Sequence, residues 1–239
     1  MNMISRRILM QGLTVSAALP ALAAVSAVRA QTRVEIPPAF GVELAPKPLS
    51  FDPAQIDGLS ERLLTSHWQN NYGGSVNALN GIKQRIAAAL ADDSTPAYVY
   101  NDLKREHLMR TGSVVLHEMY FDNISSNAGR DSELDAALNR AFGSVATWER
   151  EFRRIAGGLG GGSGWVMLAW NTHAQTLENY WMADHMHAPA SSLPLLVMDM
   201  YEHSYHMDYG AAAAQYIDAF MRNINWTEVG RRLDQSLRG

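Results

Sequence analysis

The first half of the chain carries two long segments in which apolar residues recur at helical spacing, joined by a short connection. The first segment begins near Ser60, and its pattern is interrupted at Gly73-Gly74 before it resumes. The second is introduced by Thr95-Pro96, a cap followed by a proline of the first helical turn, and continues to about Phe121. Because consecutive helices with a short connection pack as an antiparallel pair, this half is predicted to be a helical hairpin.

The second half of the chain mixes helical and strand-like segments. A polar stretch at residues 122–131 marks the boundary. Beyond it, the sequence predicts two helices, three strands and two further helices, in that order. The strand-like runs are Trp165–Trp170, Thr176–Met182 and Leu195–Met198. The last helix opens with the pattern Asn225-x-x-Glu228, which is typical of a capping box.

The pattern as a whole predicts an α+β fold with two parts. Residues 31–125 are expected to form an N-terminal domain built on the antiparallel helical hairpin, with a proline-rich, extended lead-in over residues 31–50. Residues 126–239 are expected to form a C-terminal α/β domain, in which helices flank a three-stranded antiparallel sheet.

The N-terminus has the composition of an export signal. Ser5-Arg6-Arg7 precedes an alanine-rich, weakly apolar stretch without acidic residues, which is typical of a twin-arginine signal. Pro20 and the many alanines make a membrane-spanning helix a poor alternative. Cleavage after Ala30 would remove residues 1–30, so we expect a periplasmic or secreted protein that is not bound to a membrane.

Composition excludes several classes of function. The chain of 239 residues has no cysteine, so it can form neither disulfides nor thiolate-metal bonds, and any metal must be bound by nitrogen and oxygen. The formal net charge is −4, which argues against nucleic-acid binding.

Histidines provide the candidate metal ligands. Of eight histidines, His67 and His117 each lie within the apolar face of one hairpin helix, where antiparallel packing could bring them together. His203 follows Asp199 by four residues, directly after an apolar strand. Spacing alone leaves two readings equally open, a metal site or histidines satisfied within the core.

From residue 49 to the C-terminus, the sequence resembles the iron/manganese superoxide dismutases. Their C-terminal signature, D-x-W-E-H-A-Y, reads here as the segment Asp199–Tyr205, with Tyr201 in place of tryptophan. Further matching landmarks are Leu79-Asn80, Ala141–Ser144, Gly162–Trp165 and Asn225-Trp226. The resemblance implies that one iron or manganese ion per subunit is bound by His67, His117, Asp199 and His203.

The resemblance also implies an activity and the residues that assist it. The expected reaction converts superoxide to dioxygen and hydrogen peroxide. His185 is expected to contact the metal-bound solvent in place of the family's usual glutamine, with His187 as the alternative. Trp165 and Tyr201 are expected to wall the metal pocket. The choice between iron and manganese stays open, since Ser113 occupies the position of the iron-type glutamine.

Two regions concern the subunit interface and the substrate entrance. Glu202 and Tyr205 match interface residues of the family, which implies a homodimer, and Tyr205 is also assigned to the catalytic site. Asn71 and Ser75 replace a histidine and a tyrosine of the usual entrance, and the residues 211–214 lack its usual arginine. A wider entrance with weaker steering of anions is therefore expected.

Two alternatives to the dismutase remain at this point. One is a metal-dependent oxidoreductase that acts on another small substrate. The other is an exported metal-binding or interaction protein that keeps the fold without turnover.

Overall fold

The computed structural model describes residues 36–126 and 129–238. The stretch Ile36–Gly239 forms one compact unit. The predicted export signal, residues 1–30, lies outside the described residues. Within the described ranges, no helix is both long enough and apolar enough to span a membrane.

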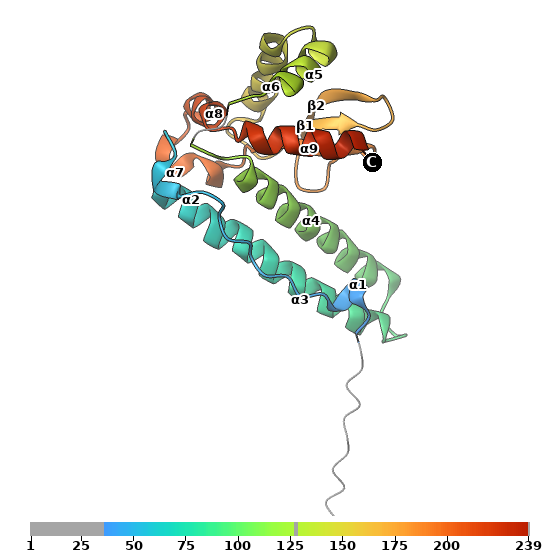
Figure 1. The fold of residues 1–239 in the computed structure, drawn as a ribbon. Coiled ribbons are helices and arrows are strands. Elements are labelled where there is room, and N and C mark those ends of the chain that lie inside the picture. The colour runs from blue at the N-terminus through green and yellow to red at the C-terminus, as the bar shows by residue number, and fades with distance from the viewer. Residues whose placement is uncertain (1–35, 127–128, 239) are drawn as a thin grey trace, which may run out of the picture. The chain divides into compact units, whose positions relative to one another are not determined.

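The helical hairpin is present as predicted. Helix α2 (Glu61–Ser66) begins at Ser60, whose hydroxyl accepts a hydrogen bond from the backbone N–H of Leu63 at 3.1 Å. The chain continues through a π-helical turn (His67–Tyr72) into α3 (Gly73–Leu90), and α4 (Ala97–Asp122) returns along α3 (Figure 1).

The predicted interruption at Gly73-Gly74 is wrong. The helix passes through both glycines, and the irregularity lies one turn earlier, where Gly73 N–H donates to the carbonyl of Trp68. This i→i−5 bond widens the turn that begins at His67. Such turns are rare in proteins and frequent at functional sites.

The proline-rich lead-in is held along the hairpin (Figure 1). Over residues 36–50 it is extended as predicted, except for a short helix α1 (Pro38–Gly41), and a 3₁₀ turn (Pro53–Gln55) follows it. The side chain of Asn80 exchanges two hydrogen bonds with the backbone of Leu44, at 2.9 and 2.8 Å. Lys47 also pairs with Glu118 on α4, so the lead-in connects both hairpin helices.

The C-terminal part contains the predicted sheet and its flanking helices. The sheet is antiparallel in the order β2-β1-β3, with β1 (Trp165–Asn171), β2 (Thr176–Met182) and β3 (Ser192–Asp199). Its helices are α5 (Ser132–Phe142), α6 (Val145–Leu159), α7 (His206–Tyr209), α8 (Ala213–Arg222) and α9 (Trp226–Arg238). Helix α6 packs on β1 and β2, while α4 and α9 pack on β3. The predicted α+β class is confirmed.

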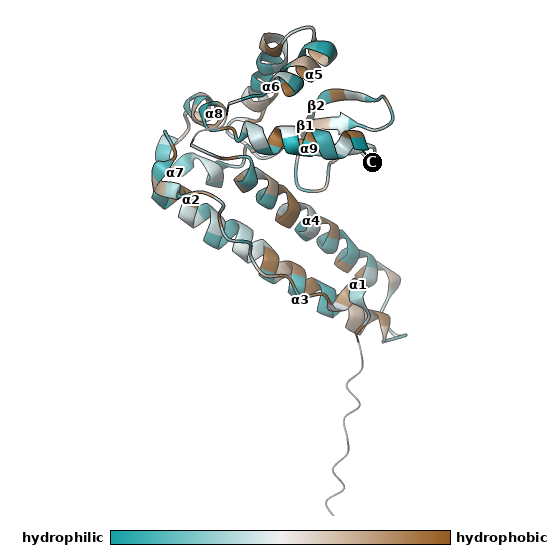
Figure 2. Cartoon of the chain, in the orientation of Figure 1, coloured by the Kyte–Doolittle hydropathy of each residue, from teal (hydrophilic) through white to brown (hydrophobic). Residues whose placement is uncertain are grey.

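Burial follows the pattern of the sequence. The central strand β1 is fully buried from Trp165 to Ala169. Along α9, hydrophobic residues alternate with hydrophilic ones (Figure 2), and Val229 and Leu233 are buried. The predicted capping box is only half formed, because the backbone N–H of Asn225 donates to Asn123 and the carboxylate of Glu228 pairs with arginines.

Asn123, at the end of α4, joins the hairpin to the sheet. Its fully buried amide donates to the carbonyl of Leu195 at 3.1 Å and accepts from the N–H of Val197 at 2.9 Å. These bonds occupy the outer edge of β3, where no further strand pairs. The side chain thereby fixes α4 against the strand that ends in Asp199.

We predict that Asn123→Ala lowers the free energy of unfolding by about 2–4 kcal/mol, because two buried backbone groups lose their partners. Urea denaturation followed by circular dichroism measures the change. Asn101→Ala, at an exposed position of the same helix, is the control. A loss under about 1 kcal/mol for Asn123→Ala would contradict this account of the edge.

Candidate metal centre

Four side chains from separate elements converge where the hairpin meets the sheet. His67 begins the π-helical turn, His117 lies on α4, Asp199 ends β3, and His203 lies in the 3₁₀ turn that follows. Each offers one ligand atom, and these atoms all lie within 4.8 Å of one another. The structure thus brings together all four residues predicted as ligands.

The cluster contains buried nitrogen atoms without hydrogen-bond partners. His67, His117 and Asp199 are each exposed by 1% or less, while the side chain of His203 is 26% exposed. Both ring nitrogens of His67 and Nε2 of His117 lack a partner. His67 Nε2 lies 3.1 Å from Asp199 Oδ2, but not in hydrogen-bond geometry. Buried polar atoms are rarely left unpaired, so these lone pairs fit coordination to a metal ion.

A hydrogen bond from its Nδ1 fixes the orientation of the His117 ring. Its Nδ1–H donates to the carbonyl of Ser113 at 2.7 Å, which leaves the lone pair of Nε2 to face the cluster. Ser113 Oγ also lies 2.8 Å from Ser75 Oγ, and both hydroxyls are buried. Ser75 therefore lies against Ser113 of the facing helix, and the expected wider entrance stays a prediction.

The pKa shifts of the clustered residues favour the protonation states that metal coordination requires. Burial lowers the pKa of His117 to about 3. Burial also lowers the pKa of His67, against the opposing influence of Asp199. Burial by itself would raise the pKa of Asp199, but the charges of His203 and His67 and the hydrogen bond of His203 hold this pKa below its usual range. Neutral imidazoles and one carboxylate form a nitrogen and oxygen donor set that suits iron, manganese or zinc.

Three further predicted residues lie beside the cluster. Trp165 Nε1–H donates to Nδ1 of His185 at 3.0 Å, and the ring of His185 stacks on Tyr201 with 4.8 Å between centroids. The centroid of His185 lies 5.9 Å from that of His117. Because the indole can only donate, Nδ1 of His185 is the acceptor, and the proton of the neutral ring is on Nε2. His187 is instead exposed and paired with Asp184 at 2.7 Å.

Other predicted residues lie outside the cluster. Tyr205, assigned by the resemblance to a subunit interface, is only 1% exposed within its own chain, and that assignment stays a prediction. Its ring stacks on Tyr216, and its hydroxyl accepts a hydrogen bond from the N–H of Gly161 at 3.1 Å. Neither of these contacts involves one of the four clustered residues. Glu202 is exposed, and Asn71 is half-buried.

Sequence reasoning missed residues that support the cluster. Tyr216, on α8, donates its hydroxyl to the backbone carbonyl of Asp199 at 2.6 Å. The rings of Tyr120 and Phe121 each lie 5.1 Å from the ring of His67. Tyr120 follows His117 by three residues on α4, so helical spacing could have identified it. Tyr216 belongs to a distant segment, and no local pattern connects it to Asp199.

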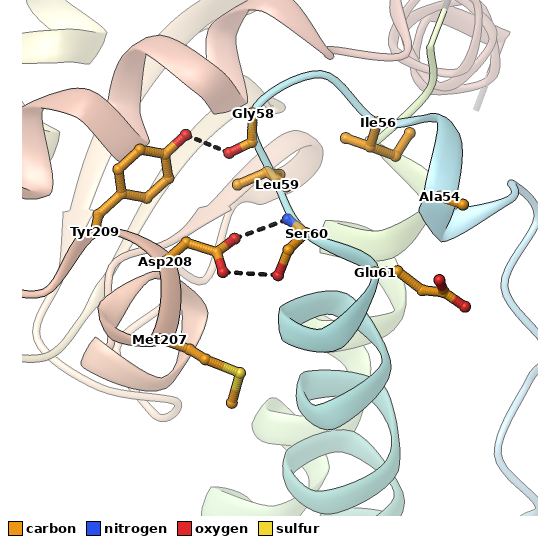
Figure 3. A pocket seen from close by; sticks show the side chains of 9 residues that line it. All are labelled: Ala54, Ile56, Gly58, Leu59, Ser60, Glu61, Met207, Asp208 and Tyr209. Carbon is orange, nitrogen blue, oxygen red and sulfur yellow. Dashed lines mark hydrogen bonds between the residues drawn. The ribbon is translucent and has the colours of Figure 1, made fainter.

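A surface pocket of about 700 Å³ lies between the start of α2 and α7 (Figure 3). The carboxylate of Asp208 accepts hydrogen bonds from N–H and Oγ of Ser60, each at 2.7 Å, and Tyr209 donates to the carbonyl of Gly58. None of the four clustered residues lines this pocket. Its hydrogen bonds instead hold the segment after His203 against the helix that leads to His67.

Comparisons with known proteins agree with this geometry. The family model of iron/manganese superoxide dismutases, C-terminal domain, matches residues 130–232. The chain is 48% identical over 192 residues to a protein of Cupriavidus metallidurans named superoxide dismutase [Fe], covering 80% of this chain and 97% of the relative. It is 30% identical over 200 residues to superoxide dismutase [Mn] 1 of Halobacterium salinarum, covering 81% and 96%. Identity to superoxide dismutase [Fe] of Aquifex pyrophilus is 30% over 193 residues, covering 78% and 89%.

Proposed function

The chain belongs to the iron/manganese superoxide dismutase family, and on that premise we propose that it converts superoxide to dioxygen and hydrogen peroxide. The proposed ligands of one iron or manganese ion are His67, His117, Asp199 and His203. The observation that carries the proposal is the set of buried, unpaired imidazole nitrogens around one carboxylate. A core that merely contained histidines would supply those atoms with hydrogen-bond partners.

The metal, when bound, would supply the redox couple, and the residues of the chain hold and orient its ligands. When bound, iron or manganese supplies a one-electron couple that accepts an electron from one superoxide and passes it to a second, which leaves as peroxide with two protons. The chain holds the ligands: Ser113 aims Nε2 of His117, and Tyr216 anchors the backbone of Asp199. The negative charge of Asp199 offsets part of the charge of the cation.

His185 is the residue we propose for handling a proton next to the metal. Trp165 donates to its Nδ1, so Nε2 carries the proton that the ring can donate, and the ring centroid lies 5.9 Å from that of His117. Stacking on Tyr201 restricts rotation of the ring. Donors that contact the solvent on a metal tune its reduction potential, which is the role proposed for His185.

The test is the metal content and the dismutation rate of protein loaded separately with iron and with manganese. We expect about one metal per chain and rapid turnover in at least one form, and the name of the 48% identical relative favours iron. His117→Ala should lose both metal and activity, because it removes a ligand from a buried site. His107→Ala, on the same helix, should keep both.

Full metal occupancy with negligible turnover of superoxide would contradict the proposal. That outcome would leave the alternatives, a metal-binding protein of the same fold or an oxidoreductase with another substrate.

We also propose that the protein is a homodimer that pairs through the turn carrying His203. Glu202 and His206 are exposed there, and Met207 is 44% exposed. Light scattering should give twice the chain mass, and Glu202→Lys should shift the mass toward the monomer. Glu133→Lys, an exposed charge reversal on α5, is the control. A mass equal to one chain for the unsubstituted protein would contradict the proposed homodimer.

The proposed location is the periplasm or the medium, reached through the signal at residues 1–30. Support comes from Arg6-Arg7 and the weakly apolar stretch after them. The N-terminus of the exported protein should begin at Gln31, and Arg6→Lys combined with Arg7→Lys should retain the uncleaved chain in the cytoplasm. Export of that double variant at the normal rate would reject the twin-arginine route.

A further inference from the structure

Gly112 of α4 is in close contact with the backbone of His185. A Cβ placed on Gly112 would lie 1.8 Å from the carbonyl oxygen of His185, 2.9 Å from its carbonyl carbon and 3.4 Å from its Cβ. These are the three nearest heavy atoms, so His185 is the first residue that a side chain at position 112 would meet. Glycine is less favourable than alanine within a helix, and the close approach explains its presence.

The contact places His185 relative to the metal ligands. Residues 183–186 form a turn after β2, and the carbonyl of His185 contacts Gly112 of α4, five residues before His117. The side chain of His185 is held separately by Trp165, whose Nε1 lies 3.0 Å from Nδ1. One residue is thus fixed through its backbone to a hairpin helix and through its ring to the sheet.

We propose that Gly112 is a positioning residue, which sets the distance of His185 from the metal ligands and, through His185, the reduction potential of the bound metal. The inference rests on the proposed function of His185. A side chain at position 112 must move the His185 carbonyl from 1.8 Å to at least 3.0 Å away. A shift of that size is enough to break the bond from Trp165, since the usual distance of such hydrogen bonds extends only to about 3.2 Å.

Other helical glycines show that the steric constraint is specific to Gly112. Gly81 on α3 and Gly158 on α6 are also helical, and a Cβ on either would meet nothing within 4 Å. Alanine at those positions should therefore be neutral or slightly stabilising. Gly81→Ala is the matched control for Gly112→Ala.

The first experiment reads the position of His185 without activity. In the full-length chain loaded with zinc, which is diamagnetic and redox-inert, the indole N–H resonance of Trp165 reports its bond to His185. In Gly112→Ala we expect this resonance to shift and to exchange with solvent about tenfold faster or more. The indole of Trp148, bonded to Asn179 at 3.1 Å, should be unchanged. Gly81→Ala should change neither.

The second experiment reads the consequence at the metal. In the iron-loaded protein, the reduction potential of Gly112→Ala should shift in the same direction as that of His185→Ala. Combining both substitutions should give the potential of His185→Ala alone, because Gly112 acts through His185. A Gly112→Ala effect that persists undiminished without the His185 ring would overturn the proposal.

The other possible results also test the positioning role of Gly112. An unchanged Trp165 resonance in Gly112→Ala would refute the proposed positioning. If neither Gly112→Ala nor Gly112→Ser folds and binds zinc, Gly112 is a requirement of the fold, and the positioning role is rejected. If the parent iron protein turns over no superoxide, the proposed function fails, while the zinc and potential measurements still decide the role of Gly112.

Discussion

The buried carboxylate of Asp199 is the interaction on which the rest of the structure depends. An ion of this kind is expensive to remove from water unless it is paired and hydrogen-bonded. Here three imidazoles surround it, and the backbone of the same residue is held by hydroxyls of Tyr216 and Ser204. The hairpin supplies His67 and His117, and the sheet supplies Asp199, so the cluster exists only when both parts are packed together. A metal ion would satisfy the unpaired nitrogens and the charge at once.

The surrounding structure serves to hold these few atoms in place. Asn123 ties α4 to the edge of β3, and the bonds between Asp208 and Ser60 tie the turn after His203 to the start of α2. Gly112 and Trp165 fix His185 from two sides. Ligand geometry in metal sites is set by such supporting contacts as much as by the ligands themselves.

Much of this arrangement could be predicted from the sequence, because its signals are local. Apolar spacing gives the hairpin, and apolar runs give the three strands. The predicted cap at Thr95 is wrong, because α4 begins after Pro96 with no side-chain cap. The four clustered residues follow from the signature around Asp199 and from the helical positions of His67 and His117. What the sequence could not reveal depends on contacts between distant segments. The π-helical turn leaves no composition marker, Ser75 is covered by Ser113 from the facing helix, and Tyr205 is buried by Tyr216.

The most direct test of the central claim is anomalous diffraction from crystals of the metal-loaded protein, recorded at the iron and manganese absorption edges. The account predicts one strong peak per chain, roughly 2.0–2.2 Å from one nitrogen of each of the three histidines and from an oxygen of Asp199, the usual range for such bonds. A principal peak elsewhere, or none between these side chains in fully loaded protein, would contradict it.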